Sequence, residues 1–179
     1  MDELIDILDD SGNFTGKTAL KSEAHKKGLF HPTVHVWCYS KSRKILLQQR
    51  GAQKKTYPLK WDVSVAGHIG AGESIETGAF REVQEEIGVT IEPSELEKII
   101  VFKKDKKHPN GVWDREFTSV FIYRLDDEIS LSKQDSEVEA LKWLAIEEFK
   151  QWINRKHLGL IPNSEERFYT VISEIESRL

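Results

Sequence analysis

The stretch that decides the fold of this chain is Gly67-His-Ile-Gly-Ala-Gly-Glu-Ser-Ile-Glu-Thr-Gly-Ala-Phe-Arg-Glu-Val-Gln-Glu-Glu-Ile-Gly-Val89. It fits the pattern G-x5-E-x7-R-E-U-x-E-E-x-G-U, in which U stands for an apolar residue. Every specified position is filled, by Gly67, Glu73, Arg81, Glu82, Val83, Glu85, Glu86, Gly88 and Val89. Because each residue type has a background usage of several per cent, a chance match is on the order of 10⁻⁷. The stretch is therefore a specific motif.

The second half of the motif predicts an amphipathic helix. Ser74 is suited to cap its start, Thr77 and the following residues are compatible with helix, and Gly88 is suited to end it. At about 100° per residue, one face of this helix carries an apolar stripe. Its members are Phe80, Val83 and Ile87, with Ala79 at the edge.

The opposite face of the same helix is acidic. Glu82, Glu85 and Glu86 are three and four residues apart, so they share that face and repel one another by roughly a few tenths of a kcal/mol per pair. A hard divalent cation such as Mg²⁺ or Mn²⁺ takes oxygen ligands and removes this repulsion. A solvated helix face is the alternative for the three glutamates alone. It leaves the fixed positions of Arg81 and Glu73 without an explanation.

Glycines in the motif also suggest contact with a ligand. Gly78 lies one turn before the glutamates, and the missing side chain there predicts room for a metal-bound phosphate. The loop from Gly67 to Gly72 predicts a backbone that can approach a ligand closely.

The motif is that of the Nudix hydrolases, and the chain resembles this family over at least Val34 to Trp143. The resemblance implies an α/β fold, the Nudix α/β/α sandwich, in which a mixed β-sheet is flanked by helices and the motif forms a loop-helix-loop. It implies a single Nudix domain over residues 1–179, with residues 1–30 as an N-terminal extension and residues 67–89 as the Nudix box. The implied reaction is Mg²⁺-dependent hydrolysis of a diphosphate linkage in a nucleoside diphosphate derivative or a related small molecule.

The resemblance also assigns metal ligands within the box. Glu82 and Glu86 are expected to bind Mg²⁺, or Mn²⁺ in its place. Glu85 is expected to complete the metal site directly or through water, and the Gly67 carbonyl adds one ligand.

Catalytic roles follow from the same resemblance. Glu116, or Glu85, is expected to take the proton from the attacking water. Asp114 is the next candidate, and an ordinary surface glutamate is the alternative interpretation of Glu116. Arg81 is expected to orient Glu73 and Glu85 through charge-assisted hydrogen bonds rather than to touch the substrate.

A second resemblance is to the isopentenyl-diphosphate isomerases, which share the Nudix fold. It rests on Phe30-His31, Leu47-Gln48-Gln49-Arg50, Tyr57-Pro58-Leu59-Lys60-Trp61 and Ser64-Val65-Ala66-Gly67-His68. The isomerase metal site uses histidines at the positions of His31 and His68, and carboxylates at those of Asp114 and Glu116. The catalytic cysteine of the isomerases, however, falls at Ala66, which cannot transfer a proton.

This departure favours a hydrolase over the two other candidates. An isomerase is disfavoured by Ala66. A non-catalytic diphosphate-binding module is disfavoured because each acidic position of the box is filled.

Substrate-binding candidates lie outside the box. They are Arg50, Lys55 and His68, and the lysine clusters at residues 54–55 and 103–107 could steer a phosphorylated substrate. Solubilising loop lysines are the alternative. His35 alternates within an expected strand, so a buried or half-buried structural histidine is favoured over a ligand. The aromatic residues Tyr57, Trp61, Trp113 and Phe117 are either core residues or stacking surfaces for a base.

Composition limits the partners and the location. The chain has 179 residues and a net charge of −4 at pH 7, which disfavours a nucleic-acid polymer as partner and leaves a small-molecule diphosphate. No apolar run approaches the roughly 20 residues of a membrane span. The acidic start lacks the basic region of a secretory signal, and the single Cys38, expected to be buried, fits a reducing cytoplasm. A homodimer is common among relatives.

The rest of the chain predicts alternating strands and helices. Strands are expected at residues 4–8, 33–39, 45–50, 61–66, 99–104, 112–125 and 140–144, and helices at 18–27, 146–154 and 164–177. Residues 51–59 and 103–111 are expected to be loops.

Overall fold

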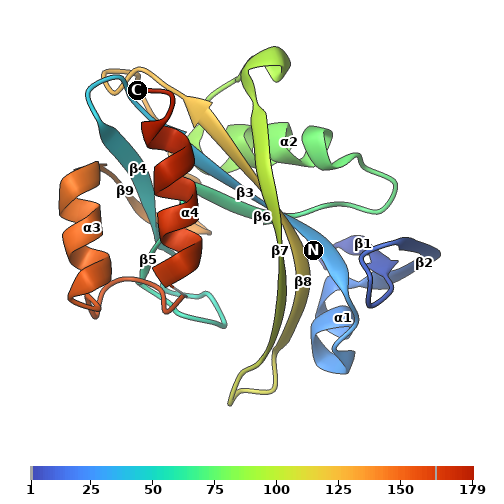
Figure 1. Cartoon of the computed structure of the whole chain (residues 1–179). Helices are drawn as coiled ribbons and strands as arrows, with labels where there is room; N and C mark the ends of the chain where they lie inside the picture. Colours follow the sequence, from blue (N-terminus) through green and yellow to red (C-terminus); the bar gives the residue numbers. More distant parts are fainter. Residues whose placement is uncertain (1, 164) are drawn as a thin grey trace.

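The centre of the molecule is a seven-stranded mixed sheet with helices on both faces (Figure 1). The computed structural model describes residues 2–163 and 165–179. The sheet has the order β5-β4-β3-β8-β7, with β6 paired to β3 and β9 paired to β4. Its strands are β3 (His31–Tyr39), β4 (Lys44–Arg50), β5 (Trp61–Asp62), β6 (Val65–His68), β7 (Glu97–Lys107), β8 (Trp113–Arg124) and β9 (Val138–Ala145).

Alternation along the strands produces two apolar layers. On β3, Val34, Val36 and Cys38 pack toward α2 (Ile75–Ile87), whereas Trp37 and Tyr39 pack toward the opposite layer. That opposite layer is covered by α3 (Ile146–Asn154) and α4 (Glu165–Glu176) (Figure 1). These layers confirm the predicted sandwich. Cys38 is fully buried, as predicted, and burial raises the pKa of its thiol to about 12.

The parallel pairing of β3 with β8 brings distant residues together. His31 lies opposite Glu116, Thr33 opposite Thr118, and His35 opposite Val120. On the other side of β3, the antiparallel β6 places His68 opposite Thr33. A histidine from each of two strands and a carboxylate from a third thereby meet at one end of the sheet.

The N-terminal segment forms a separate unit beside that end. The hairpin of β1 (Leu4–Leu8) and β2 (Phe14–Leu20) is followed by α1 (Lys21–Lys27), which lies near β8 (Figure 1). A small apolar cluster holds the unit together, formed by Ile5, Ile7, Ala19 and Ala24.

Three sequence predictions need correction. The helix expected at residues 18–27 begins only at Lys21, because residues 14–20 pair with β1 as a strand. The strand expected at 61–66 is broken into β5 and β6. The loop expected at 103–111 is strand as far as Lys107, because its backbone pairs with β8.

The remaining elements agree with prediction. Helix α3 covers the expected residues, and α4 matches the last predicted helix, whose first residue, 164, lies outside the described residues. A short 3-10 helix, η1 (Pro93–Glu95), follows α2 at the predicted turn.

Candidate functional site

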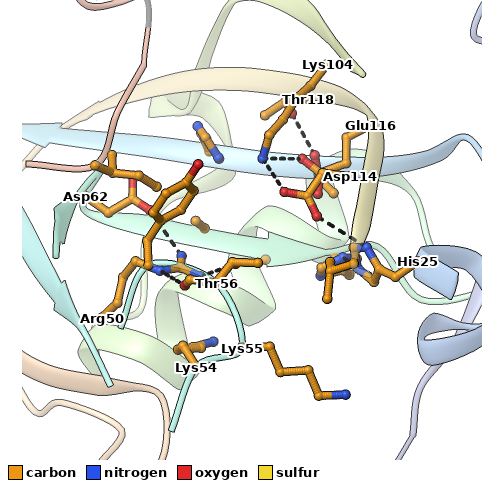
Figure 2. Close-up of a pocket in the computed structure, with 18 of the residues that line it drawn as sticks. His25, Arg50, Lys54, Lys55, Thr56, Asp62, Lys104, Asp114, Glu116 and Thr118 are labelled. Carbon is orange, nitrogen blue, oxygen red and sulfur yellow. Dashed lines mark hydrogen bonds and ion pairs between the residues drawn. The ribbon is translucent and has the colours of Figure 1, made fainter. Parts of the chain in front are cut away.

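A cavity of about 1640 Å³ opens between the sheet, α1 and the loop at residues 51–59 (Figure 2). Its wall includes box residues from α2 and the preceding loop, namely Gly67, His68, Arg81, Glu82 and Glu85. The lining also contains His25, Lys104, Asp114 and Glu116, of which His25 lies 3.2 Å from His68. Strand pairing and the packing of α2 thus bring Gly67, Arg81, Glu82 and Glu85 into one cavity with the predicted strand carboxylates, whereas Glu73 and Glu86 do not line it.

Helix α2 forms for the predicted reasons. The Ser74 hydroxyl accepts a hydrogen bond of 3.1 Å from the Thr77 backbone N–H, and Gly88 ends the helix at a φ of 72°. The predicted stripe packs inward, with Ala79, Val83 and Ile87 fully buried and Phe80 half-buried. The three glutamates of the acidic face differ in burial, since Glu82 and Glu86 are buried and Glu85 is exposed.

Arg81 holds three carboxylates and one carbonyl. Its Nε and Nη2 donate to the two oxygens of Glu73 at 3.0 and 2.9 Å. Its Nη1 donates to Glu82 at 2.8 Å and to Glu85 at 3.1 Å, and Nη2 also donates to the His68 carbonyl at 2.8 Å. The guanidinium therefore fixes the relative positions of Glu73, Glu82 and Glu85.

Glu86 lies deeper than the other box glutamates. One of its oxygens, Oε2, accepts hydrogen bonds of 2.9 Å from the Gln48 side-chain amide and from the Ala66 backbone N–H. Burial raises the pKa of Glu86 to about 8. Burial also raises the pKa of Glu82, although the Arg81 charge opposes this effect. Burial thus disfavours the ionised forms of Glu82 and Glu86, and the positive charge of a bound cation would offset that cost.

Two box glycines make room for side chains. A Cβ atom on Gly67 would lie 1.9 Å from the Glu82 carboxyl carbon, so glycine is needed for Glu82 to reach its position. Gly78 does not leave space for a phosphate, which corrects the sequence interpretation. A Cβ there would lie 2.4 Å from Ile69 Cδ1, so Gly78 allows α2 to pack on the preceding loop.

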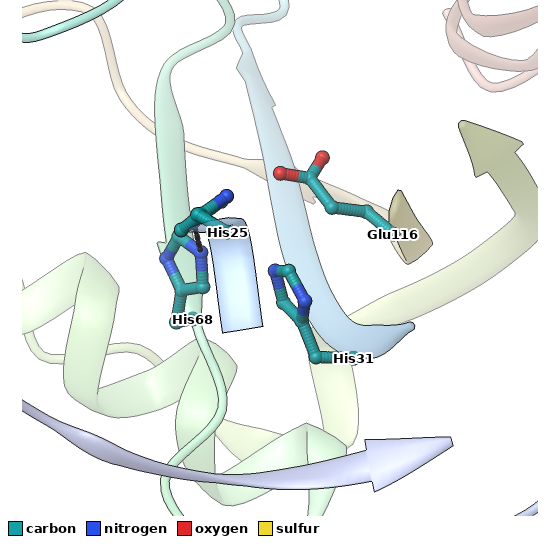
Figure 3. Close-up of side chains that lie close together, drawn as sticks. All are labelled: His25, His31, His68 and Glu116. Carbon is teal, nitrogen blue, oxygen red and sulfur yellow. Dashed lines mark hydrogen bonds between the residues drawn. The ribbon is translucent and has the colours of Figure 1, made fainter. Parts of the chain in front are cut away.

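A second group of ligand-type side chains lies at the same cavity, which three of them line and the fully buried His31 adjoins (Figure 3). One ligand atom from each of four residues falls within 4.8 Å of the others, in the set His25, His31, His68 and Glu116. Burial lowers the pKa of both His31 and His68, which keeps the two imidazoles neutral. In the described part of the chain, His31 Nε2 is buried without a hydrogen-bond partner, whereas His25 Nδ1 lies 3.4 Å from Asp114 Oδ1. Imidazole nitrogens that converge beside carboxylates fit a divalent cation.

Asp114 lies beside this histidine-glutamate cluster. It accepts a hydrogen bond of 2.7 Å from Lys104 Nζ (Figure 2) and another of 2.8 Å from His108 Nε2. Burial raises the pKa of Asp114, but its contacts with His25, Lys104 and His108 lower it by more. Asp114 is thus an ionised carboxylate at the edge of the cluster.

The predicted substrate-binding residues Arg50, Lys55 and His68 all line the cavity. Arg50 donates to Asp62 at 3.1 Å and to the Thr56 carbonyl, which fixes the loop at residues 51–59 (Figure 2). His35, which was expected to be structural, is half-buried and also lines the cavity.

Sequence reasoning missed His25 and Gln48. His25 has no informative spacing from the other histidines, because α1 reaches the site only through the N-terminal hairpin. Lys104 was expected only as one member of a lysine cluster that could steer substrate, and its hydrogen bond to Asp114 depends on the pairing of β7 with β8. Gln48 had a usable signal, since the interior position of an expected strand rarely holds a polar side chain without a partner.

The comparisons agree with this geometry. The family model described as NUDIX domain matches residues 29–163. This chain belongs to the Nudix hydrolase family. Among its relatives, an uncharacterised Nudix hydrolase of Clostridium acetobutylicum is 37% identical over 94% of this chain and 84% of its own length.

Two other relatives differ in the share of their own length that this chain matches. Nudix hydrolase 3 of Arabidopsis thaliana is 34% identical over 90% of this chain, which spans only 22% of that protein. Isopentenyl-diphosphate Delta-isomerase 2 of Photorhabdus laumondii is 31% identical over 86% of this chain and 84% of its own length. Both predicted resemblances, to Nudix hydrolases and to the isomerases, are therefore found.

Solved structures show the same Nudix fold. The Deinococcus radiodurans protein DR0079 matches with a TM-score of 0.70 and 18% identity, over 94% of this chain and 97% of its own. The NUDIX domain of Shewanella oneidensis NrtR, crystallised with ADP ribose, matches with a TM-score of 0.59 and 18% identity, over 82% and 86% of the two chains. No helix within residues 2–163 and 165–179 is long and apolar enough to cross a membrane.

Proposed function

We propose that the protein hydrolyses a diphosphate linkage in a small molecule with the help of divalent cations. The observation that carries this proposal is the meeting of two ligand sets in one cavity. One set is the box carboxylates held by Arg81, and the other is the histidine-glutamate cluster. A diphosphate placed between them would face cation ligands on both sides.

The two sets suit different cations. Glu82, Glu85 and Glu86, with the Gly67 carbonyl, offer only oxygen atoms, which suit Mg²⁺ or Mn²⁺. The histidine-glutamate cluster adds imidazole nitrogens, which suit Mn²⁺ or Zn²⁺. When bound, such cations neutralise diphosphate charge and favour attack by water on phosphorus.

The side chains of the protein would position the water and the substrate. Glu85 is exposed to the cavity and held at one oxygen by Arg81, so its second oxygen can accept a proton from water. Glu116, in the histidine-glutamate cluster, is the other candidate base. Arg50 and Lys55 supply positive charge at the mouth of the cavity.

A phosphate-release screen tests this proposal. The purified chain would be given nucleotide sugars, dinucleotides, nucleoside di- and triphosphates and isopentenyl diphosphate, with Mg²⁺ or Mn²⁺. Turnover should appear with at least one diphosphate, and Glu82→Gln should lower it at least 100-fold without loss of folding. Glu139→Gln, at an exposed position of β9, serves as the matched control. Absence of turnover on all of these compounds would reject the hydrolase function.

An isomerase function is the second candidate, because the histidine-glutamate cluster and an isomerase relative both favour it. Ala66 lines the cavity where proton transfer to carbon would need a cysteine. We expect no interconversion of prenyl diphosphate isomers by the natural chain, as measured by NMR. Detection of that interconversion would favour the isomerase instead.

A further inference from the structure

The two nitrogens of the His25 ring face different neighbours. Its Nε2 lies 3.2 Å from His68 Nε2, inside the histidine-glutamate cluster (Figure 3). Its Nδ1, on the other side of the ring, lies 3.4 Å from Asp114 Oδ1 (Figure 2). Asp114 therefore meets His25 from outside the cluster, at the nitrogen that does not point toward His68.

His31 has the same arrangement of inner and outer nitrogens. Its Nδ1 donates a hydrogen bond of 2.9 Å to the Leu29 carbonyl, and its Nε2 is the buried nitrogen without a partner among the described residues. A carbonyl oxygen can only accept, so in the neutral ring Nδ1 carries the proton and Nε2 the lone pair. A partner outside the cluster thus decides which nitrogen can bind a cation.

Asp114 is itself held on the side away from His25. Its Oδ2 accepts the hydrogen bonds from Lys104 and His108, which leaves Oδ1 to face the imidazole. The Lys104 ammonium, 2.7 Å from Oδ2, would repel a cation that approached this oxygen. Lys104 lies farther from Glu116, at 3.5 Å from Oε2, and Oε1 of Glu116 is not part of that contact. Of the two carboxylates, Glu116 is therefore the better placed to bind a cation.

Other contacts attach α1 to β8. Arg115 Nη1 donates to the Gly28 carbonyl at 3.2 Å. Gly28 ends α1 at a φ of 64° and packs so closely on Trp113 that a Cβ would lie 2.3 Å from Cε3 of the ring. These contacts place the helix, whereas the contact from Asp114 acts on the orientation of the His25 ring.

We propose that Asp114 is a positioning residue that orients His25 toward a cation, rather than a ligand of that cation. The isomerase resemblance implies a ligating carboxylate at this position, so the assignment separates this chain from that resemblance. It rests on the proposed function only in taking the histidine-glutamate cluster as a cation site. A carboxylate on the outer nitrogen of a ligating histidine fixes the ring and makes the other nitrogen more basic.

A double-variant cycle tests whether Asp114 acts through His25. Co²⁺ would be titrated into the purified protein and followed by its visible absorption, which distinguishes a site with imidazole ligands from the all-oxygen box. Asp114→Ala should weaken Co²⁺ binding about 10- to 100-fold in the natural chain. In His25→Ala protein the same change should weaken it less than about twofold, because the ring through which Asp114 acts is gone. Equal losses in the two backgrounds would overturn the proposal.

Two further carboxylates serve as comparisons. Glu116→Ala removes an expected ligand and should weaken Co²⁺ binding in both backgrounds. Asp62→Ala removes another buried carboxylate of the cavity, which is paired with Arg50 at 3.1 Å, and should leave the Co²⁺ affinity unchanged. A loss in Asp62→Ala as large as that in Asp114→Ala would overturn the proposal, since any buried carboxylate would then have the same effect.

The absorption spectrum at saturating Co²⁺ provides a second measurement. Asp114→Ala should give the spectrum of the natural chain, because the same ligands are present, whereas Glu116→Ala should give a different one. A changed spectrum in Asp114→Ala would make Asp114 a ligand and overturn the proposal. If Asp114→Ala does not fold, the double variant of Lys104→Met and Asp114→Leu replaces the buried ion pair with apolar side chains of similar size and allows the same comparison.

The role of Asp114 and the hydrolase function can fail separately. A loss of Co²⁺ affinity that depends on His25, without turnover of any diphosphate, would retain the role of Asp114 and reject the hydrolase. Turnover together with equal losses in the two backgrounds would retain the hydrolase and reject the role of Asp114. Absence of Co²⁺ binding to the natural chain would also reject that role.

Discussion

At the residue scale, Arg81 shows how one side chain organises several acidic groups. Its five N–H groups allow hydrogen bonds to Glu73, Glu82 and Glu85 and to the His68 carbonyl at the same time. A lysine has one ammonium group and cannot reproduce this fork. The hydrogen bonds at residue 81 therefore require the planar shape of the guanidinium as well as its charge.

We expect Arg81→Lys to lower turnover by about 10- to 100-fold, the usual effect of losing a group that orients metal ligands. The loss should appear in kcat and in the Mg²⁺ concentration needed for half-maximal activity, since misplaced carboxylates bind the cation less well. Arg155→Lys, outside the cavity, is the control. A wild-type Mg²⁺ dependence in Arg81→Lys would contradict the assigned role.

The raised pKa of Glu86 predicts that the stability of the metal-free protein depends on pH. Burial raises its pKa to about 8, against 4.5 for the ordinary carboxyl. The folded state therefore holds a proton that the unfolded state releases, so stability is greatest below about pH 4.5 and falls as the pH rises toward 8. The fall should be at most roughly 4 kcal/mol.

Denaturant titrations of wild type and Glu86→Gln in EDTA, from pH 5 to pH 8, measure this dependence. The variant should lose less stability than wild type over the range, because glutamine does not titrate. Saturating Mg²⁺ should reduce the slope of wild type, since binding favours the ionised carboxylate. Parallel curves for the two proteins in EDTA would refute the prediction.

At the element scale, α2 is fixed by its caps, its apolar stripe and its glycine. Ser74 and Gly88 define its ends, and Gly78 allows it to lie against Ile69. Glycine within a helix costs roughly 0.5–1 kcal/mol relative to alanine, so its presence needs a packing reason. The 2.4 Å approach to Ile69 Cδ1 supplies that reason.

We expect Gly78→Ala to destabilise the protein by about 1–3 kcal/mol, despite the better helix propensity of alanine, because the new methyl overlaps Ile69. Ile69→Val removes the Cδ1 atom and should restore part of the loss in the double variant. Thermal unfolding of both single variants and the double variant measures the coupling. Strict additivity would mean that Ile69 is not the obstacle.

At the scale of the whole molecule, the cavity is completed by two segments outside the NUDIX match. Helix α1 contributes His25, and α4 contributes Phe168 and Val171. Helix α1 and the last helix thus line the cavity, although both lie outside the residues that the NUDIX model matches.

His25→Ala tests the contribution of α1. Its affinity for Mn²⁺ should fall about 10- to 100-fold in calorimetry, because one of four ligands is lost. His157→Ala is the control, since His157 stacks on Trp152 outside the cavity. Unchanged Mn²⁺ affinity in His25→Ala would remove α1 from the metal site.

Taken alone, the sequence determined the Nudix family, the sandwich and the chemistry expected of α2, because caps, apolar stripe and acidic face are all local patterns in one helix. Local patterns also located most strands. They failed at residues 14–20 and 105–107, where strand formation depends on partners supplied by β1 and β8.

Only the tertiary structure decided which residues share the cavity. The parallel pairing of β3 with β8 placed His31 opposite Glu116, and α1 added His25 from outside the box. It also showed that Gly78 serves packing against Ile69 rather than space for a phosphate. These relations join residues that are close in space and far apart in sequence, so no spacing along the chain could reveal them.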